Sequence, residues 1–179
     1  MGVSRGKGFE EVVRKAAMMC PDVSIDRFPD PMAGYGGIRN ICDFVVYRYP
    51  VQVYLECKAY TGNTLNFKAA ITEDQWRGLL QKSTIEGVTA GVLVWFIDHD
   101  LTGFVPIQEL ERLKQDGHKS LNVNDLKDGE VVWVPLLGKK KRVYYEYTFE
   151  PFISCIVMKD LLKSMRRLSD GKEGKQQGS

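Results

Sequence analysis

The sequence predicts an α/β fold with a mixed central β-sheet flanked by helices. Residues 5–20 carry apolar side chains at helical spacing. Residues 41–60 hold two β-rich runs around Pro50, which predicts a hairpin. Residues 89–97 are almost entirely apolar, which is typical of a strand buried on both faces. The order of helix, hairpin, helix, strand and helix therefore favours a mixed sheet covered by helices.

The N-terminal third supplies the first helix and the hairpin. Pro21 follows the helix of residues 5–20, as expected for a helix that ends there. Residues 21–40 are rich in Pro, Gly and Asp, so we expect a loop. The two strands of the hairpin are predicted at residues 41–49 and 51–60.

The middle of the chain alternates helices with the buried strand. Thr72, Glu73, Asp74 and Gln75 have the pattern of a capping box, which predicts a helix to about Glu86. A second helix is predicted at residues 107–115.

The C-terminal third predicts two strands, a helix and a tail. Strands are expected at residues 131–136 and 142–149, joined by a basic turn at residues 138–141. A helix is expected at residues 155–168. Residues 169–179 are polar and contain glycine, which is typical of a disordered tail. We therefore expect one domain over residues 1–168, followed by this tail.

Bulk composition narrows the class of protein. The chain has 179 residues, 44% of them hydrophobic and 27% charged, which is ordinary globular composition. It has no uncharged apolar run of membrane-spanning length and no signal-peptide core after Met1, so we expect a cytoplasmic, intracellular protein with no membrane partner. The four cysteines form no Cys-x-x-Cys pair, which favours buried, reduced thiols. No phosphate-binding Gly-x-x-x-x-Gly-Lys-[Ser/Thr] loop is present, so ATP-driven chemistry is not indicated.

Three charged residues of the hairpin form the candidate site. Glu56 and Lys58 are two apart on one strand, so their side chains point to the same face. If the strands pair around Pro50, Asp43 comes close to them. Two carboxylates and the Cys57 carbonyl could then hold Mg²⁺, which prefers oxygen ligands. Lys58 could orient water or stabilise a phosphate transition state, so the pattern favours phosphodiester hydrolysis. A simple Glu56–Lys58 ion pair on an exposed face is the alternative.

These residues resemble a known nuclease family. The segment Arg5–Glu11, then Asp43, then Glu56-Cys57-Lys58, then Gln75 is similar to the PD-(D/E)xK nuclease superfamily, most of all to RecU-type Holliday junction resolvases. The similarity covers roughly residues 5–110. It implies a restriction-endonuclease-like core, Mg²⁺ with Mn²⁺ as a substitute, and a bacterial or phage recombination setting.

The resemblance also implies roles for individual residues. Asp43 and Glu56 become metal ligands and Lys58 the catalytic lysine. Glu10 would approach the metal from the first helix, although a solvated carboxylate favoured by the helix dipole is the alternative. Gln75 would position the water or a phosphate, and its alternative is the capping box alone; both can hold together.

DNA contacts are expected from basic residues outside the catalytic hairpin. The first helix offers Arg5 and Lys7, although Arg5 could equally be a frayed, exposed terminus. RecU-type proteins carry a long stalk before the catalytic Asp, and here the short loop with Arg27 and Arg39 takes its place. A second basic group is the run Lys139, Lys140, Lys141 and Arg142.

The sequence therefore predicts an Mg²⁺-dependent endonuclease that cleaves four-way DNA junctions. A homodimer is expected, because symmetric cutting of two strands needs two sites related by a two-fold axis. The alternatives are a nuclease acting on duplex, flap or DNA ends, and a catalytically silent DNA-binding protein. The short stalk interval keeps the first alternative open.

Overall fold

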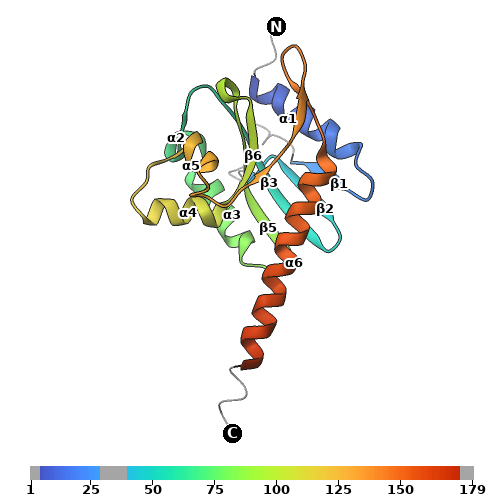
Figure 1. The fold of residues 1–179 in the computed structure, drawn as a ribbon, viewed down its shortest axis with the longest axis vertical. Coiled ribbons are helices and arrows are strands. Elements are labelled where there is room, and N and C mark those ends of the chain that lie inside the picture. The colour runs from blue at the N-terminus through green and yellow to red at the C-terminus, as the bar shows by residue number, and fades with distance from the viewer. Residues whose placement is uncertain (1–4, 29–39, 174–179) are drawn as a thin grey trace, which may run out of the picture.

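The computed structural model describes residues 5–28 and 40–173, and six of its strands form one central sheet (Figure 1). The strand order is β1-β2-β3-β5-β6-β8. β3 and β5 are parallel, whereas the other neighbouring pairs are antiparallel, so the predicted mixed sheet is confirmed. The strands of this sheet are β1 (Ser24–Arg27), β2 (Phe44–Arg48), β3 (Val51–Tyr60), β5 (Val88–Phe96), β6 (Leu101–Pro106) and β8 (Val134–Pro135).

Helices cover both faces of the sheet (Figure 1). α1 and the start of α6 pack on one face, and α2 to α5 lie on the other. Two small ribbons, β4 with β7 and β9 with β10, stand beside the main sheet. These elements are α1 (Arg5–Met18), β4 (Thr64–Asn66), α2 (Phe67–Ala70), α3 (Glu73–Ser83), the 3-10 turn η1 (Ile97–His99), α4 (Ile107–Gln115), β7 (Ser120–Asn122), α5 (Val123–Lys127), β9 (Gly138–Lys140), β10 (Tyr145–Tyr147) and α6 (Phe149–Glu173).

Alternation along β3 sets what each face of the sheet carries. Val53 and Leu55 are buried in the cluster beneath α1 and α6, together with Phe9 of α1. Tyr54 packs against the opposite cluster beneath α3 and α4. Because successive side chains point to opposite faces, Glu56 belongs on the α3 side of the sheet. β5 is buried throughout from Ala90 to Phe96, which confirms the prediction for that strand.

Several predicted elements agree closely with the structure. β3, α1 and α4 occupy the expected segments. The capping box also forms: Thr72 accepts the Gln75 amide N–H, and the Gln75 side chain accepts the Thr72 N–H. Cys20, Cys42 and Cys57 are buried free thiols and Cys155 is partly buried, as predicted from their spacing.

Two strands of the central sheet, and the small ribbon of β4 and β7, were not predicted from the sequence. β1 lies inside the predicted loop of residues 21–40, and β6 precedes α4 where no strand was assigned. Among the described strands β1 pairs with β2 alone, so it is an edge strand that needs no continuous apolar face, and its pattern is correspondingly polar. β2 begins at Phe44 rather than at residue 41.

The C-terminal region differs in its boundaries. The expected basic turn at residues 138–141 is largely strand β9, so the turn falls between β9 and β10. α6 begins at Phe149, before the predicted residue 155, because Phe149, Phe152 and Ile153 are all buried in the core. The helix continues to Glu173, so residues 169–173 of the predicted tail are helical. Among the residues described, no helix combines the length and apolar character needed to cross a membrane.

Candidate active site

The β2–β3 hairpin brings Asp43 and Glu56 together. Phe44 pairs with Leu55, so the next position outward places Asp43 opposite Glu56. Asp43 Oδ2 accepts a hydrogen bond of 2.7 Å from the Cys57 backbone N–H. That bond fixes the Asp43 carboxylate against β3, where the sequence analysis expected it to meet Glu56.

Glu56 is the most deeply buried charged residue described. Its relative exposure is 1%, and its Oε1 accepts hydrogen bonds from Lys58 Nζ at 2.6 Å and Gln75 Nε2 at 2.7 Å. Its Oε2 is also buried, yet this atom has no hydrogen-bond partner among the described residues. A buried carboxylate oxygen without a donor is costly unless it binds something else.

Burial shifts the proton affinity of Glu56. Desolvation, helped by the nearby negative charge of Asp43, raises the pKa of the Glu56 carboxyl to about 7. Lys58 and Gln75 oppose that rise by stabilising the ionised form. Glu56 therefore holds a proton more strongly than an exposed glutamate, and a cation would have to displace it near neutral pH.

Gln75 links helix α3 to strand β3. Its Oε1 accepts the Thr72 N–H of the capping box at 3.1 Å, while its Nε2 donates to Glu56. One end of this amide therefore takes part in the capping box and the other contacts Glu56. The start of α3 is thereby tied to the Glu56 carboxylate. Positioning of a water or a phosphate by Gln75 stays a prediction.

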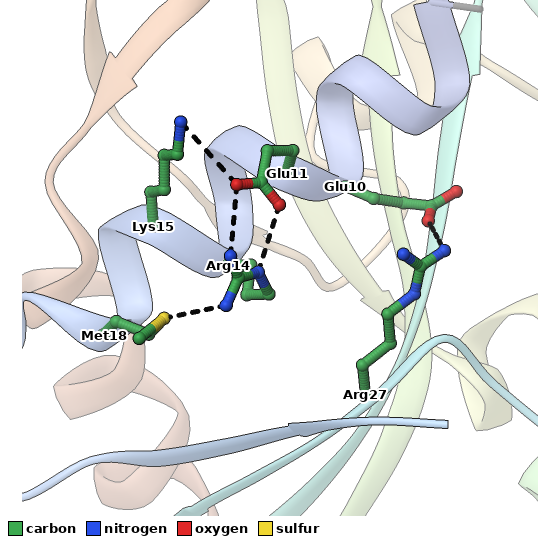
Figure 2. Close-up of polar contacts among 6 residues, drawn as sticks. All are labelled: Glu10, Glu11, Arg14, Lys15, Met18 and Arg27. Atoms are coloured by element: carbon green, nitrogen blue, oxygen red, sulfur yellow. Dashed lines mark hydrogen bonds and ion pairs between the residues drawn. The ribbon is translucent and has the colours of Figure 1, made fainter. Parts of the chain in front are cut away.

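Glu10 reaches this region from α1. Its Oε2 forms a 2.9 Å ion pair with Arg27 Nη2 on β1, and Figure 2 shows it pointing away from its neighbour Glu11. After burial, the negative charges of Asp43, Glu56 and Glu10 all help to raise the pKa of the Cys57 thiol well above its ordinary value. The charges that act on the Cys57 thiol therefore come from α1 (Glu10), from β3 (Glu56) and from the residue just before β2 (Asp43).

The donor set fits one hard cation in part. No group of three or more His, Cys, Asp or Glu side chains within residues 5–28 and 40–173 is arranged to hold a metal ion. The carboxylates of Asp43 and Glu56 can supply oxygen ligands, and the unpartnered Oε2 of Glu56 is an orphaned atom that a cation would satisfy. Direct coordination by Glu10, or by the Cys57 carbonyl, stays a prediction.

The predicted DNA-binding residues occupy two places and are partly neutralised. Arg5 and Lys7 are exposed at the start of α1, whereas Arg27 is engaged by Glu10. Arg39 lies outside the described residues, as does the Gly-rich part of the predicted loop.

The basic run lies on the β9–β10 ribbon, which packs beside α1 (Figure 1). Lys140 pairs with Asp100 at 2.6 Å and Lys141 with Glu146 at 2.7 Å, while Lys139 and Arg142 are exposed. DNA contact by any of these residues stays a prediction.

The Glu10–Arg27 pair is the feature that sequence reasoning missed. The sequence predicted Glu10 near the metal and Arg27 in contact with DNA, but it did not predict that the two would pair. The pairing requires β1, whose polar sequence gave no strand signal, so nothing in the sequence placed Arg27 beside α1.

No family model and no curated protein sequence matches the chain. Among solved structures, the chain is similar to Hjc of Archaeoglobus fulgidus, a Holliday junction resolvase from an archaeal hyperthermophile. The sequences are 21% identical and the TM-score is 0.45, over 66% of this chain and 89% of that one. A likeness this distant carries no argument about function, so the assignment has to stand on the residues of the site.

Proposed function

We propose that this protein is a metal-dependent endonuclease that hydrolyses the phosphodiester backbone of branched DNA, with a four-way junction as its substrate. The observation that carries the proposal is the buried Glu56 carboxylate, which Lys58 and Gln75 hold by one oxygen while its other oxygen has no partner among the described residues. Asp43 lies across the hairpin from it, held by the Cys57 N–H. A purely structural Glu56–Lys58 pair on an exposed face would leave neither oxygen of Glu56 buried and unsatisfied.

Asp43 and Glu56 are the residues that would hold the cation. Bound Mg²⁺, or Mn²⁺ in its place, supplies Lewis-acid stabilisation of the phosphate and activation of water. Asp43 is held for this task by the Cys57 N–H, and Glu56 by Lys58 and Gln75. Such preorganisation keeps ligand oxygens in place without rearrangement when the substrate arrives.

Lys58 and Gln75 act next to those ligands. The Lys58 ammonium is partly exposed, with a side-chain exposure of 28%, so it can face a bound phosphate while it contacts Glu56. A cation there stabilises the negative charge that grows on the phosphate oxygens as the bond breaks. Gln75 fixes the Glu56 carboxylate and thereby the position of its free oxygen.

The choice of branched DNA rests on the motif resemblance to RecU-type resolvases. Arg5, Lys7, Lys139 and Arg142 are exposed and can contact phosphates on a substrate larger than one duplex end. We further propose a homodimer, since paired nicks across a junction require two sites.

The test is cleavage of labelled DNA. We expect the unmodified protein with Mg²⁺ to nick a four-way junction symmetrically, and Asp43→Asn and Lys58→Ala to lose at least about 100-fold in rate, the order seen when a charge-stabilising group is removed. Lys68→Ala is the matched control for Lys58→Ala, because Lys68 is an exposed lysine on α2.

The substrates are run side by side so that the alternatives separate. Equal cutting of plain duplex or of a flap would replace the junction by another DNA substrate. Binding without cutting in Mg²⁺ and in Mn²⁺ would contradict the nuclease assignment and leave a DNA-binding protein.

A further inference from the structure

The second half of α6 carries an apolar stripe that faces away from the protein's own core. Met158, Leu161, Leu162 and Met165 are exposed by 58%, 39%, 47% and 65%. Met158 precedes Leu161 and Leu162 by three and four residues, and Met165 follows them by four and three, so all four lie on one face of the helix. Large exposed apolar patches on a helix mark interaction surfaces, since single scattered apolar residues would not align in this way.

That stripe is not a continuation of the core. Phe152, Ile153 and Ile156 of the same helix are buried against the sheet. At 3.6 residues per turn, the mean direction of this buried set lies about 180° from that of the exposed stripe. Figure 1 shows α6 leaving the body of the molecule, so the second half of the helix has open space beside it.

Charged residues are kept off the stripe. Between residues 158 and 167 the charged side chains all lie at least about 90° around the helix from the centre of the stripe. Lys159 and Lys163 fold back onto the body, where they donate to the Trp133 carbonyl and to Gln108 Oε1. The other charged residues in this range are Asp160, Arg166 and Arg167.

We propose that this stripe is the contact through which two copies of the chain associate, helix α6 against helix α6. In heptad terms Met158, Leu161 and Met165 occupy the seam positions, and Leu162 and Ser164 flank it. In a pair of helices, charged side chains at the positions that flank the apolar seam normally form ion pairs between the helices, and these ion pairs select the partner. Here the flanking positions are uncharged, so a second copy meets no like charge, whereas an acidic partner would find no cation beside the seam.

The self-association stands without the nuclease assignment, but its use for paired cuts rests on the proposed function. Two copies joined by a common surface present their sites as a symmetric pair.

Sedimentation equilibrium of the full chain tests the proposal without any cleavage assay. We expect a mass twice the 20.3 kDa of the chain at about 100 µM protein. The double variant Leu161→Glu/Met165→Glu should raise the dissociation constant at least about tenfold. Arg167→Glu is the matched control, because it changes the net charge by the same amount on the opposite side of the same helix.

Thermal unfolding separates a lost contact from a lost fold. Leu161 and Met165 are exposed, so the double variant should unfold within a few degrees of the unmodified protein. A monomeric full chain at that concentration would overturn the proposal. So would a double variant whose dissociation constant equals that of Arg167→Glu. A dimer that cuts no DNA would leave this inference intact and contradict the proposed function instead.

Discussion

At the scale of single residues, the site depends on a carboxylate that destabilises the fold. Glu56 is 1% exposed, and one of its oxygens has no hydrogen-bond partner among the residues described. Burying an ionised group costs free energy that Lys58 and Gln75 offset only in part, as the raised pKa of Glu56 indicates. A buried carboxylate that destabilises the fold is compatible with a role in binding, because selection for function tolerates a cost in stability.

Replacement of Glu56 by an uncharged residue should therefore stabilise the protein at alkaline pH. Burial raises the pKa of Glu56 in the folded state to about 7 from its ordinary value of 4.5, so the folded state binds more protons than the unfolded state between these values. The contribution of Glu56 to stability consequently falls as pH rises through that window and is least favourable above pH 7. We expect Glu56→Gln to gain about 1–3 kcal/mol at pH 8.

Urea unfolding at pH 5 and pH 8 measures this effect. The gain from Glu56→Gln should be smaller at pH 5, where the native carboxyl is already mostly protonated. An equal gain or loss at both values would show that Glu56 is not shifted. The same variant should have lost cleavage, so that stability and activity change in opposite directions.

The two adjacent carboxylates of α1 allow a second residue-scale prediction. Glu10 pairs with Arg27 near the site, whereas Glu11 pairs with Arg14 and Lys15 on a different side of the helix (Figure 2). We expect Glu10→Gln to reduce cleavage about 10- to 100-fold, the usual effect of residues that support metal ligands. Glu11→Gln removes only an exposed ion pair, so its cleavage rate should match that of the unmodified protein. Equal rates in the two variants would remove Glu10 from the site.

At the scale of elements, the hairpin carries the proposed ligands Asp43 and Glu56, and the start of α3 holds one of them, Glu56. The capping box of α3 includes Gln75, so the same contacts that begin the helix also position the Glu56 carboxylate. α5 begins with a comparable capping box, in which Asn122 caps the helix far from Glu56 in the chain. These two helices give a matched pair for separating stability from activity.

Loss of either cap should cost about 1 kcal/mol of stability, but only one should affect the reaction. Thr72→Ala removes the hydroxyl that accepts the Gln75 N–H, so we expect both a lower unfolding midpoint and slower junction cleavage. Asn122→Ala should lower the midpoint by a similar amount and leave the cleavage rate unchanged. Comparable loss of cleavage in both variants would mean that α3 contributes only stability.

The sequence predicted the elements that position the site better than those around it. Capping chemistry and hairpin pattern are local, so α3, β3 and the facing of Glu56 and Lys58 could be read from neighbouring residues. β1 and the Glu10–Arg27 pair depend on contacts between segments distant in the chain, and the polar edge strand carries no periodic signal. The orphaned Glu56 oxygen likewise depends on how α3 covers the sheet.

At the scale of the whole molecule, the two faces of the sheet have different tasks. α1 and the first half of α6 bury one face, and α3 and α4 bury the other, which carries Glu56 of β3. The second half of α6 extends beyond this core and exposes its own apolar stripe. The proposed catalytic residues and the proposed surface for self-association therefore lie on different elements of one chain.

Binding of Mn²⁺ followed by electron paramagnetic resonance tests the central claim most directly, because it requires neither DNA nor turnover. At pH 8 we expect the unmodified protein to bind Mn²⁺, with affinity that weakens as pH falls through about 7 and Glu56 takes up a proton. Asp43→Asn and Glu56→Gln should each weaken binding at least about tenfold, whereas Glu11→Gln should not. Mn²⁺ binding that is equally strong in all of these proteins would contradict a cation site at Asp43 and Glu56.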